Sequence, residues 1–550
     1  MHSGGKRKKP LRLIFALRRK VKMTNHTDHT SYDEVPYGSY AFSQSHPDRL
    51  ATLGRLFGMS PAPLTRCRVL ELGCASGGNL LPMAFQLPDS EFAGVDLSAK
   101  HVEKALKTIQ EMGMKNVRIK QASILDVDES WGKFDYIICH GVYSWVPKEV
   151  QDKIISVSSA NLAPNGIVYV SYNTYPGWHM RDSLRHMMLY HIRHFKGMRQ
   201  QIDQAKALID FLSRHVPTEN NAYGMLLKNE LDILNKLKDW HFFHDHLEEV
   251  NAPVYFHQFA EHAARHNLQY LGEAELGTML MSKMPKEVAE ELGKINKDIV
   301  ATEQYMDFFR NRYFRQTLLC HRGVRLKRNL NPGDVKNQFV ASVLTPEKMP
   351  VDLSPGVLHT FRTPRGQTVS TSRPLTKAAL AILRENWPCS ISFDMLSEEA
   401  IKRMDAEPAL KGQNVVRDWQ ALAGDLLQGY TVSAVEFHAW QGNSVSRPGE
   451  RPKASPFAVC QSRQGEQNVV NLRHEQVPVD PLTQHLLNAL DGTRDRAALF
   501  DYLGQLISNG TLNAQSDNEP VRDPELIRKN LEKDIEQRLA YLAVSALLME

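Results

Sequence analysis

Short apolar runs alternate with longer stretches of helical periodicity between residues 68 and 173. Runs rich in β-branched, aliphatic and aromatic residues, bounded by Gly, Asn or Asp, are typical of buried strands. Five segments fit this description: 68–73 (RVLELG), 91–97 (EFAGVDL), 116–124 (NVRIKQASI), 134–141 (FDYIICHG) and 167–173 (IVYVSYN). Because strands that alternate with helices form parallel sheets, we expect an α/β domain here.

The stretch 98–113 (SAKHVEKALKTIQEMG) carries the clearest helix signals. Ser98 is a good N-cap, and Gly113 stands where a helix should end. At helical spacing one face of this segment is apolar and should pack on the sheet; it contains Val102, Ala105, Leu106, Ile109 and Met112. We expect two further helices in this domain, one ending at Leu87 and one near 149–162.

The pattern changes after about residue 180 and stays mostly helical to about residue 325. The long segments 229–250 and 302–321 are both predicted to be helical. A shift in composition at 329–338 then introduces short strands and turns, which continue to about residue 375.

The order of elements after residue 375 is that of a small winged-helix-like unit. A helix at 375–386 is followed by a second helix from Ser397 and by a strand at 430–440. The polar stretch 447–467 separates this unit from a final helical part. The winged-helix-like unit lacks a strongly basic recognition helix in its helical stretch from residue 375, so we expect protein binding or dimerisation rather than DNA binding.

Length and composition narrow the class of protein. A chain of 550 residues exceeds one ordinary core and predicts two to four domains. No apolar run approaches the roughly 18 residues that span a bilayer, so we expect no membrane span. The six cysteines are scattered and form no CxxC pair, which argues against disulfides and against a cysteine-based zinc site. A reducing, cytoplasmic setting fits best.

The positive net charge comes from the first 23 residues, which carry nine Lys and Arg and no acidic residue. The remaining chain has a small excess of acidic groups, so nucleic acid is not expected as the main partner. The segment itself has three interpretations: a membrane-surface arm, an RNA-binding arm, or a disordered extension ahead of a true start at Met23. We favour a basic disordered tail over 1–30.

The turn after the first predicted strand has the composition of a ligand-binding loop: Gly73, Cys74, Ala75, Ser76, Gly77, Gly78 and Asn79. Small residues let a ligand approach the backbone, and the next helix offers free amides. A dinucleotide loop has glycine where this chain has Ala75, and Glu71 would repel a diphosphate. S-adenosylmethionine has no phosphate but carries a sulfonium and an ammonium, so the acid favours this cofactor.

Further acids stand at the ends of the next two strands. Asp96 ends the second strand, where a carboxylate can accept from both ribose hydroxyls. Asp126 follows the third strand and can accept from the adenine amino group, or Ser123 can fill that position instead. Taken one at a time, the loop glycines could form only a tight turn, and Asp96 could be an ordinary helix cap. The order of these residues at the ends of successive strands favours a cofactor site instead.

Three motifs in this region resemble class I S-adenosylmethionine-dependent methyltransferases: 69–79 (VLELGCASGGN), 94–98 (GVDLS) and 134–147 (FDYIICHGVYSWVP). Segments 32–59, 171–188, 251–276 and 303–322 resemble a bacterial subfamily with a "methyltransferase regulatory domain" behind the catalytic one. The rickettsial-type protein lysine methyltransferases belong to this group. The resemblance covers about 31–325 and implies a further C-terminal domain.

In this fold the residues that face the methyl acceptor follow the fourth and fifth strands. Aromatic rings attract sulfonium and amine cations, and a histidine can take a proton. The acceptor-side candidates are His140, Tyr143, Trp145, Tyr172, Asn173, Tyr175 and Trp178. The alternative is that Trp145 and Trp178 pack helices onto the sheet and that His140 bonds a backbone carbonyl.

Two charged clusters remain. His241, His244, His246, His257, His262 and His266 lie close together in sequence, and the last two have a zinc-compatible spacing of four. No nearby carboxylate motif accompanies them and the regulatory-domain resemblance implies no metal, so we expect none. The basic run Arg310, Arg312, Arg315, Arg322, Arg325, Lys327 and Arg328 fits an acidic partner or, more commonly, a solvated helix face.

These observations predict a Rossmann-like methyltransferase domain over 31–215, a helical regulatory domain over 216–330 and a winged-helix-like α+β region over 331–550. The expected activity is transfer of the S-adenosylmethionine methyl group to a protein lysine, in a bacterial cytoplasmic enzyme that can be a homodimer. Two alternatives stay open: a small-molecule methyltransferase, and a non-catalytic cofactor-binding scaffold or sensor with a DNA-binding C-terminus.

Overall fold

A computed structural model describes residues 38–295, 298–411, 416–512, 515–516, 519–520 and 524–549. The basic segment 1–30 lies outside the described residues, so its assignment as a disordered tail stays a prediction. Within the described part, no helix is both long enough and apolar enough to cross a bilayer.

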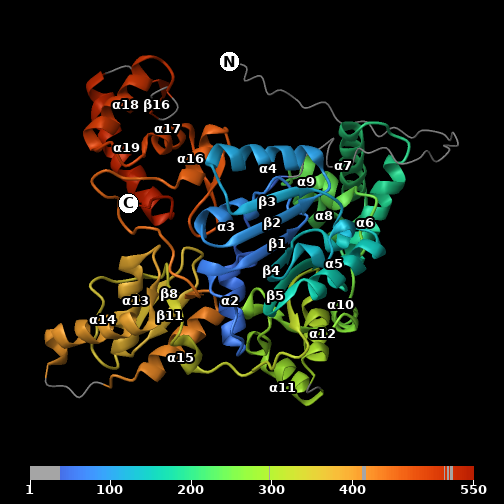
Figure 1. Ribbon diagram of the computed structural model, residues 1–550, viewed down its shortest axis with the longest axis horizontal. Coiled ribbons are helices and arrows are strands. Elements are labelled where there is room, and N and C mark those ends of the chain that lie inside the picture. Colours follow the sequence, from blue (N-terminus) through green and yellow to red (C-terminus); the bar gives the residue numbers. More distant parts are fainter. Residues whose placement is uncertain are drawn as a thin grey trace.

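A seven-stranded sheet forms the centre of the molecule (Figure 1). Its strand order is β3-β2-β1-β4-β5-β7-β6, and β1 to β5 run parallel. The order reverses between β1 and β4, which places a crevice at the carboxyl ends of these strands. The strands are β1 (Arg68–Leu72), β2 (Glu91–Asp96), β3 (Val117–Gln121), β4 (Phe134–Cys139), β5 (Leu162–Asn173), β6 (Leu268–Glu273) and β7 (Phe314–His321).

Hydrophobic side chains cover both faces of this sheet because successive strand residues point to opposite sides. Val69 of β1 joins a core with helices on one face, whereas Leu70 joins a second core on the other. The first face carries α2 (Pro47–Leu56), α3 (Leu80–Gln86) and α4 (Ala99–Met112); the second carries α5 (Lys148–Ala160) and α10 (Phe256–Arg265). The five predicted strands and their parallel arrangement are confirmed.

Helix α4 shows how local signals set an element. The Ser98 hydroxyl accepts a hydrogen bond from the His101 amide, and Gly113 ends the helix at φ +61°. Both predicted end signals are therefore confirmed. The predicted apolar face is wrong at Leu106, which is 47% exposed, because the helix turns His101 and Thr108 toward the core instead.

The prediction of an all-helical region from 180 to 325 is wrong at two segments. β6 and β7 lie inside it and complete the sheet, with β7 antiparallel to both β5 and β6. The segment predicted as one long helix at 302–321 is helix α12 (Ile299–Arg310) followed by β7. The segment 229–250 is likewise divided, between α8 (Ala222–Leu234) and α9 (Asp239–His246).

Helices α6 (Gly177–Ile192) and α7 (Met198–His215) pack with α8 and α9 around a separate small core. Helix α11 (Lys286–Ile295) lies near α12 at the opposite end of the sheet (Figure 1). The regulatory region therefore surrounds the edge of the sheet formed by β5, β7 and β6 rather than standing apart from it.

The predicted basic helix face at 310–328 is also wrong. Arg315 lies on β7 and is fully buried, with its guanidinium bonded to Glu273, Glu303 and Asp307. Arg310 donates to the carbonyls of Thr278 and Leu280. The run crosses a helix end, a strand and a turn, so most of its charges have partners inside the protein, whereas Arg322 and Arg325 are exposed, and it forms no single surface.

The region 331–445 shares its core with the catalytic domain, whereas 450–549 has a core of its own. The first contains β8 (Phe339–Ala341), β9 (Thr345–Pro346), β10 (His359–Arg362), β11 (Thr368–Thr371), α13 (Pro374–Asn386), β12 (Ile391–Ser392), α14 (Phe393–Ala406), α15 (Trp419–Thr431) and β13 (Glu436–His438). Most of 430–440, predicted as a strand, is the end of α15 and a turn; only its last part is β13.

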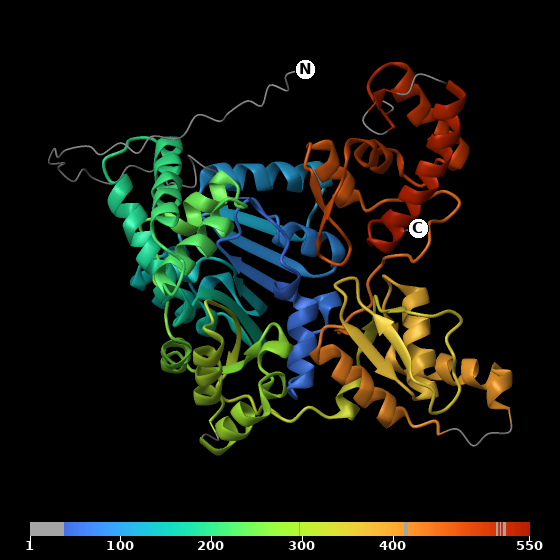
Figure 2. The ribbon, with the colours of Figure 1, turned by 180° about the vertical axis from the view of Figure 1, so that it is seen from behind.

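The last region forms a lobe near α3 and α4, as the two opposite views agree (Figures 1 and 2). It contains α16 (Pro456–Arg463), β14 (Asn468–Val470), β15 (Gln476–Pro478), α17 (Pro481–Ala489), α18 (Arg496–Ser508), β16 (Gln515–Ser516), β17 (Glu519–Pro520) and α19 (Pro524–Val544). The polar stretch 447–467 is therefore not only a linker, since α16 lies within it and packs into the lobe core.

Candidate functional site

The glycine loop is held against the end of the neighbouring strand. The amides of Gly73 and Cys74 both donate to the carbonyl of Val95, at 2.8 and 3.0 Å. Ala75 adopts a left-handed conformation at φ +46°, as do Gly73 and Gly77 at φ +77°. A non-glycine residue rarely adopts this conformation without a compensating contact, and Ala75 has one, described next.

The Asp96 carboxylate fixes the loop to the second strand. Its Oδ2 accepts from the Ala75 amide at 2.8 Å, and its Oδ1 accepts from the Ser98 amide at 2.9 Å. Each carboxylate oxygen has a second lone pair, so the group can also accept from two vicinal hydroxyls. The predicted ribose-binding role of Asp96 is compatible with these contacts and stays a prediction.

Glu71 is buried at the end of β1, and burial raises its pKa to about 7. The Asn79 amide donates to Oε1 at 2.7 Å, which opposes that rise. The other carboxylate oxygen, Oε2, is buried and has no hydrogen-bond partner. Since an orphaned buried carboxylate oxygen is costly, an ammonium group placed there would supply the missing donor. The unpartnered acceptor atom of Glu71 thus fits the ammonium group of the predicted cofactor.

A short segment before α2 crosses the cofactor loop. The Gly78 amide donates to Ser39 Oγ at 2.7 Å, and a Cβ on Gly78 would lie 2.4 Å from the Ser39 carbonyl group. The Phe42 ring stacks on His140 with the ring centres 3.7 Å apart. Residues 39–42 therefore contact both the cofactor loop and the loop after β4. Segment 32–59 was identified by its resemblance to the subfamily, but the role of residues 39–42 at the cofactor loop was not predicted.

Asn79 links the loop to the C-terminal lobe. Its Oδ1 accepts from the Phe42 amide at 2.9 Å and lies 2.8 Å from His474 Nε2. Its Nδ2 donates to Glu71 and to Ser45 Oγ. Burial lowers the pKa of His474 well below its usual value, so the ring is neutral and its Nε2–H donates to Asn79. This tautomer fixes the amide so that Nδ2 faces Glu71.

We expect His474→Ala to weaken S-adenosylmethionine binding. The Asn79 Oδ1 atom then keeps only Phe42 and Ser45 as partners. Loss of one buried hydrogen bond costs about 1 kcal/mol, which is roughly a fivefold change in affinity. Isothermal titration calorimetry of the full chain measures the effect. His485→Ala on α17 is the matched control from the same lobe. Equal affinity in both variants would contradict this role for His474.

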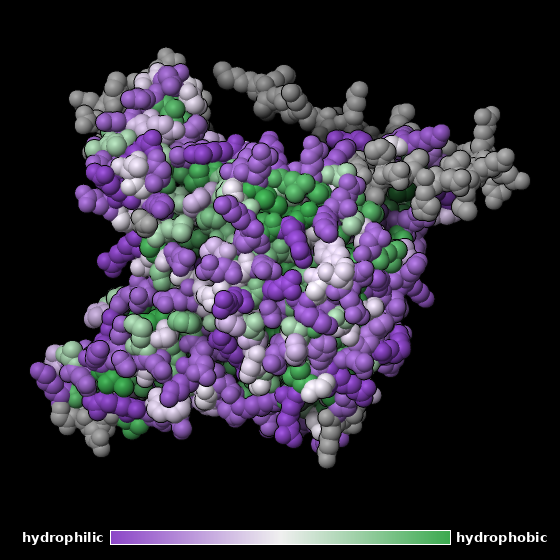
Figure 3. All heavy atoms as spheres, in the orientation of Figure 1, coloured by the Kyte–Doolittle hydropathy of each residue, from purple (hydrophilic) through white to green (hydrophobic). Residues whose placement is uncertain are grey.

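The two candidates for adenine binding hold each other. Asp126 Oδ2 accepts from the Ser123 amide at 3.1 Å, and Ser123 Oγ accepts from the Leu125 amide at 3.2 Å. Nearby, Leu97 and Leu125 are exposed by 58% and 40%. Figure 3 shows hydrophobic side chains gathered over the region of α4 on a mainly polar face. A flat apolar ring can cover such leucines, and Ser123 and Asp126 remain candidates.

His140 lies where the loop after β4 begins. Its Nδ1 is 2.9 Å from the Tyr169 hydroxyl and 3.4 Å from Ser171 Oγ, so its partners are side chains rather than a backbone carbonyl. Burial lowers the pKa of His140 to about 3. The ring is therefore neutral near pH 7 and is a weak base there.

Two of the predicted aromatic residues lie inside the core beneath the acceptor loops. Tyr143 and Tyr172 are buried and pack against Phe259 of α10. The Tyr143 hydroxyl is 2.9 Å from His262 Nδ1, and the Tyr172 hydroxyl is 3.0 Å from Thr317 Oγ1. Their placement favours a packing role.

Trp145 and Trp178 contact each other edge to face, with ring centres 6.2 Å apart. Trp178 is 3% exposed, and its indole Nε1 is buried with no partner among the described residues. This is the packing arrangement left open above. The unpartnered indole N–H is nevertheless a donor available within the acceptor region.

Tyr175 and Asn173 join a polar group that the sequence did not reveal. The Tyr175 hydroxyl donates to Asp182 Oδ2 at 3.1 Å, and Asn251 donates to Asp182 Oδ1 at 3.3 Å. Asn173 Nδ2 donates to Asn251 Oδ1 at 2.9 Å. Burial and Asp182 raise the pKa of Tyr175 to about 12, so it remains protonated. Asp182 and Asn251 lie in the segments 171–188 and 251–276, whose resemblance to the subfamily did not single out either residue.

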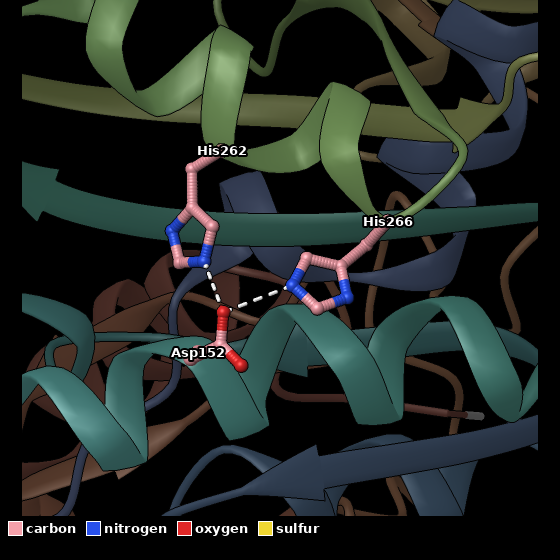
Figure 4. Close-up of side chains that lie close together, drawn as sticks. All are labelled: Asp152, His262 and His266. Carbon is pink, nitrogen blue, oxygen red and sulfur yellow. Dashed lines mark hydrogen bonds and ion pairs between the residues drawn. The ribbon is translucent and has the colours of Figure 1, made fainter.

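The histidine cluster is divided by the fold. His241 pairs with Asp245 and His244 with Glu248, each within α9 or its end. His262 and His266 instead meet Asp152 of α5, with both Nε2 atoms within 3.0 Å of the same carboxylate oxygen (Figure 4). The carboxylate that was missing from the local sequence thus comes from more than 100 residues away.

Three family models match parts of the chain. A methyltransferase domain matches 64–228, a predicted methyltransferase regulatory domain matches 238–321, and a PKMT C-terminal winged helix domain matches 450–547. The last of these covers the lobe with its own core, whereas we had compared the helices and strand at 375–440 with a winged helix. The region between the second and third matches shares the catalytic core.

Whole-chain relatives agree with this order of domains. The protein RP789 of Rickettsia prowazekii is 39% identical over 95% of this chain and 94% of its own. The solved structure of PKMT2 from Rickettsia typhi in complex with AdoHcy is 33% identical, covers 94% of this chain and 100% of its own, and has a TM-score of 0.84. This chain therefore belongs to the PKMT family of S-adenosylmethionine-dependent methyltransferases, which combine a catalytic domain with a regulatory domain and a C-terminal winged helix.

Proposed function

We propose that this enzyme methylates a lysine side chain of a protein. The observation that carries the proposal is the polar group of Tyr175, Asp182, Asn173 and Asn251 at the carboxyl end of β5. S-adenosylmethionine supplies an electrophilic methyl group when bound. The chain's own task is to bring a neutral amine to that methyl and to exclude water.

A lysine amine needs help to become neutral, because its ordinary pKa is about 10.4. Removal of water and the nearby sulfonium both lower that pKa. Asp182 is the acid nearest to Tyr175, and the tyrosine hydroxyl already donates to it. We propose that Tyr175 and Asp182 orient the lysine amine. We also propose that aromatic rings in the loops after β4 and β5 contact the methylene groups of the lysine and its ammonium group before the proton is lost.

We expect Tyr175→Phe to lower turnover at least tenfold while cofactor affinity changes less than twofold. The hydroxyl is lost from the acceptor side, whereas Glu71 and Asp96 are untouched. Turnover is measured with methyl-labelled cofactor and affinity by calorimetry. Tyr223→Phe on α8 is a tyrosine control away from these loops. Wild-type turnover in Tyr175→Phe would exclude its hydroxyl from the reaction.

Incubation of the enzyme with methyl-labelled cofactor and a bacterial lysate tests the acceptor class. Label in protein bands that amino-acid analysis recovers as methyl-lysine supports the proposal. Label confined to small metabolites would instead favour the small-molecule alternative, and cofactor binding without any transfer would favour the scaffold. A cytoplasmic location is part of the same proposal, since a protein acceptor and the cofactor must meet there.

A further inference from the structure

Asp152, His262 and His266 form a compact cluster outside the methyl-transfer site. Asp152 Oδ1 lies 2.9 Å from His262 Nε2 and 3.0 Å from His266 Nε2 (Figure 4). All three ligand atoms lie within 4.8 Å of one another. Asp152 comes from α5 of the catalytic domain, and the two histidines come from α10 and its C-terminal cap in the regulatory domain.

The cluster is held on its inner side and open on its outer side. The Tyr143 hydroxyl lies 2.9 Å from His262 Nδ1, so the other ring nitrogen faces Asp152. The His262 side chain is 11% exposed, whereas those of His266 and Asp152 are 24% and 60% exposed. A ligand arriving from solvent therefore reaches three convergent atoms whose inner member is already oriented.

We propose that these three residues bind one Zn²⁺ ion through the Nε2 atoms of His262 and His266 and a carboxylate oxygen of Asp152. Two imidazoles and one carboxylate are a usual ligand set for zinc, and water can complete a tetrahedral site on the exposed side. Zinc is preferred over Mg²⁺ or Ca²⁺ because those ions select oxygen ligands.

Occupation of the site needs a tautomer change at both His262 and His266, because the Nε2–H of each donates to the Asp152 carboxylate when no metal is bound. Without metal, the Nε2–H of His262 donates to Asp152, and the Tyr143 hydroxyl donates to the Nδ1 atom of His262. With zinc bound, the Nε2 lone pair binds the metal, and Nδ1–H donates to the Tyr143 oxygen. A histidine that ligates a metal usually donates its other N–H in this way.

The charges around the site are mixed. The Arg265 guanidinium lies near His262 and opposes a cation, whereas the Asp152 carboxylate attracts it. Because Asp152 is itself a ligand, its charge acts at the shortest distance. The bound ion would join α5 to α10 and thus fasten the regulatory domain to the catalytic domain, next to the loop that carries Tyr143.

Calorimetric titration of the tag-free, chelator-treated full chain with ZnCl₂ tests the proposal. We expect one equivalent bound by the wild type and affinity at least tenfold weaker for Asp152→Ala and for His266→Ala. Both changes are at partly exposed positions, so the fold should persist, and circular dichroism checks this. His241→Ala is the matched control because it removes a histidine with one carboxylate partner and no third ligand.

Thermal unfolding gives a second measurement that does not depend on methyl transfer. One equivalent of ZnCl₂ should raise the Tm of the wild type and of His241→Ala but leave that of Asp152→Ala unchanged. Absence of stoichiometric binding by the wild type would overturn the proposal. So would equal binding by wild type and Asp152→Ala, since the cluster would then be a set of hydrogen bonds only.

Discussion

Replacement of Asp96 by alanine should lower the affinity for S-adenosylmethionine about a hundredfold. The carboxylate fixes the Ala75 amide in its left-handed turn. We also expect it to accept hydrogen bonds from the two ribose hydroxyls of the cofactor. Each hydrogen bond to a charged group is worth about 1.5–3 kcal/mol, and 1.4 kcal/mol is tenfold in affinity. Calorimetric titration with the cofactor measures the change.

Glu91→Ala is the control for Asp96→Ala because it lies at the other end of the same strand. Glu91 is exposed and pairs with Arg68, far from the glycine loop along β2. Its removal should leave cofactor binding within twofold of the wild type. If Asp96→Ala bound the cofactor as tightly as Glu91→Ala does, the carboxyl end of β2 would not hold the ribose.

Replacement of Arg315 by alanine should destabilise the protein by about 3–5 kcal/mol. The guanidinium is fully buried and bonds to Glu273, Glu303 and Asp307, which would lose their shared partner. Removing one member of a buried ion group leaves uncompensated buried charge, which is the costly case. Urea unfolding followed by circular dichroism measures the loss.

The loss in Arg315→Ala should shrink as the pH falls. Burial already raises the pKa values of Glu303 and Asp307, and removal of the guanidinium raises them further. A carboxyl group whose pKa is higher in the folded state stabilises the protein below its unfolded pKa, and this contribution is lost as the pH rises. Arg322→Ala, at an exposed position of the same basic run, should show neither effect. A pH-independent deficit would argue that lost packing dominates.

Local sequence signals predicted the parallel half of the sheet well. β1 and β2 are apolar runs that carry a candidate acid at or next to their last residue, and Ser98 and Gly113 mark the ends of α4. β7 was missed because it follows α12 with almost no break and because Arg315 is its second residue. A charged residue in a strand normally signals solvent, whereas this one is neutralised by three acids from elements outside the strand.

The candidate-site residues also fall into two groups, those that local sequence signals predicted and those that they did not. Glu71, Ala75 and Asp96 were predictable because each lies within or beside a strand end that forms the loop. His474 lies 395 residues from Asn79, and Asp152 lies 110 residues from His262. No spacing rule relates such pairs, since only the packing of whole domains brings them together. Asn251 was missed for the same reason, since its partners Asn173 and Asp182 lie 78 and 69 residues away.

The segment from Ser39 to Phe42 has a thermodynamic consequence. It touches the cofactor loop at Gly78 and the acceptor side at His140 within four residues. Any reshaping of one pocket that displaces this segment must alter the other pocket's affinity, and by linkage the influence is equal in both directions. We therefore expect the bound cofactor to change the affinity for the methyl acceptor, and the bound acceptor to change the affinity for the cofactor by the same factor.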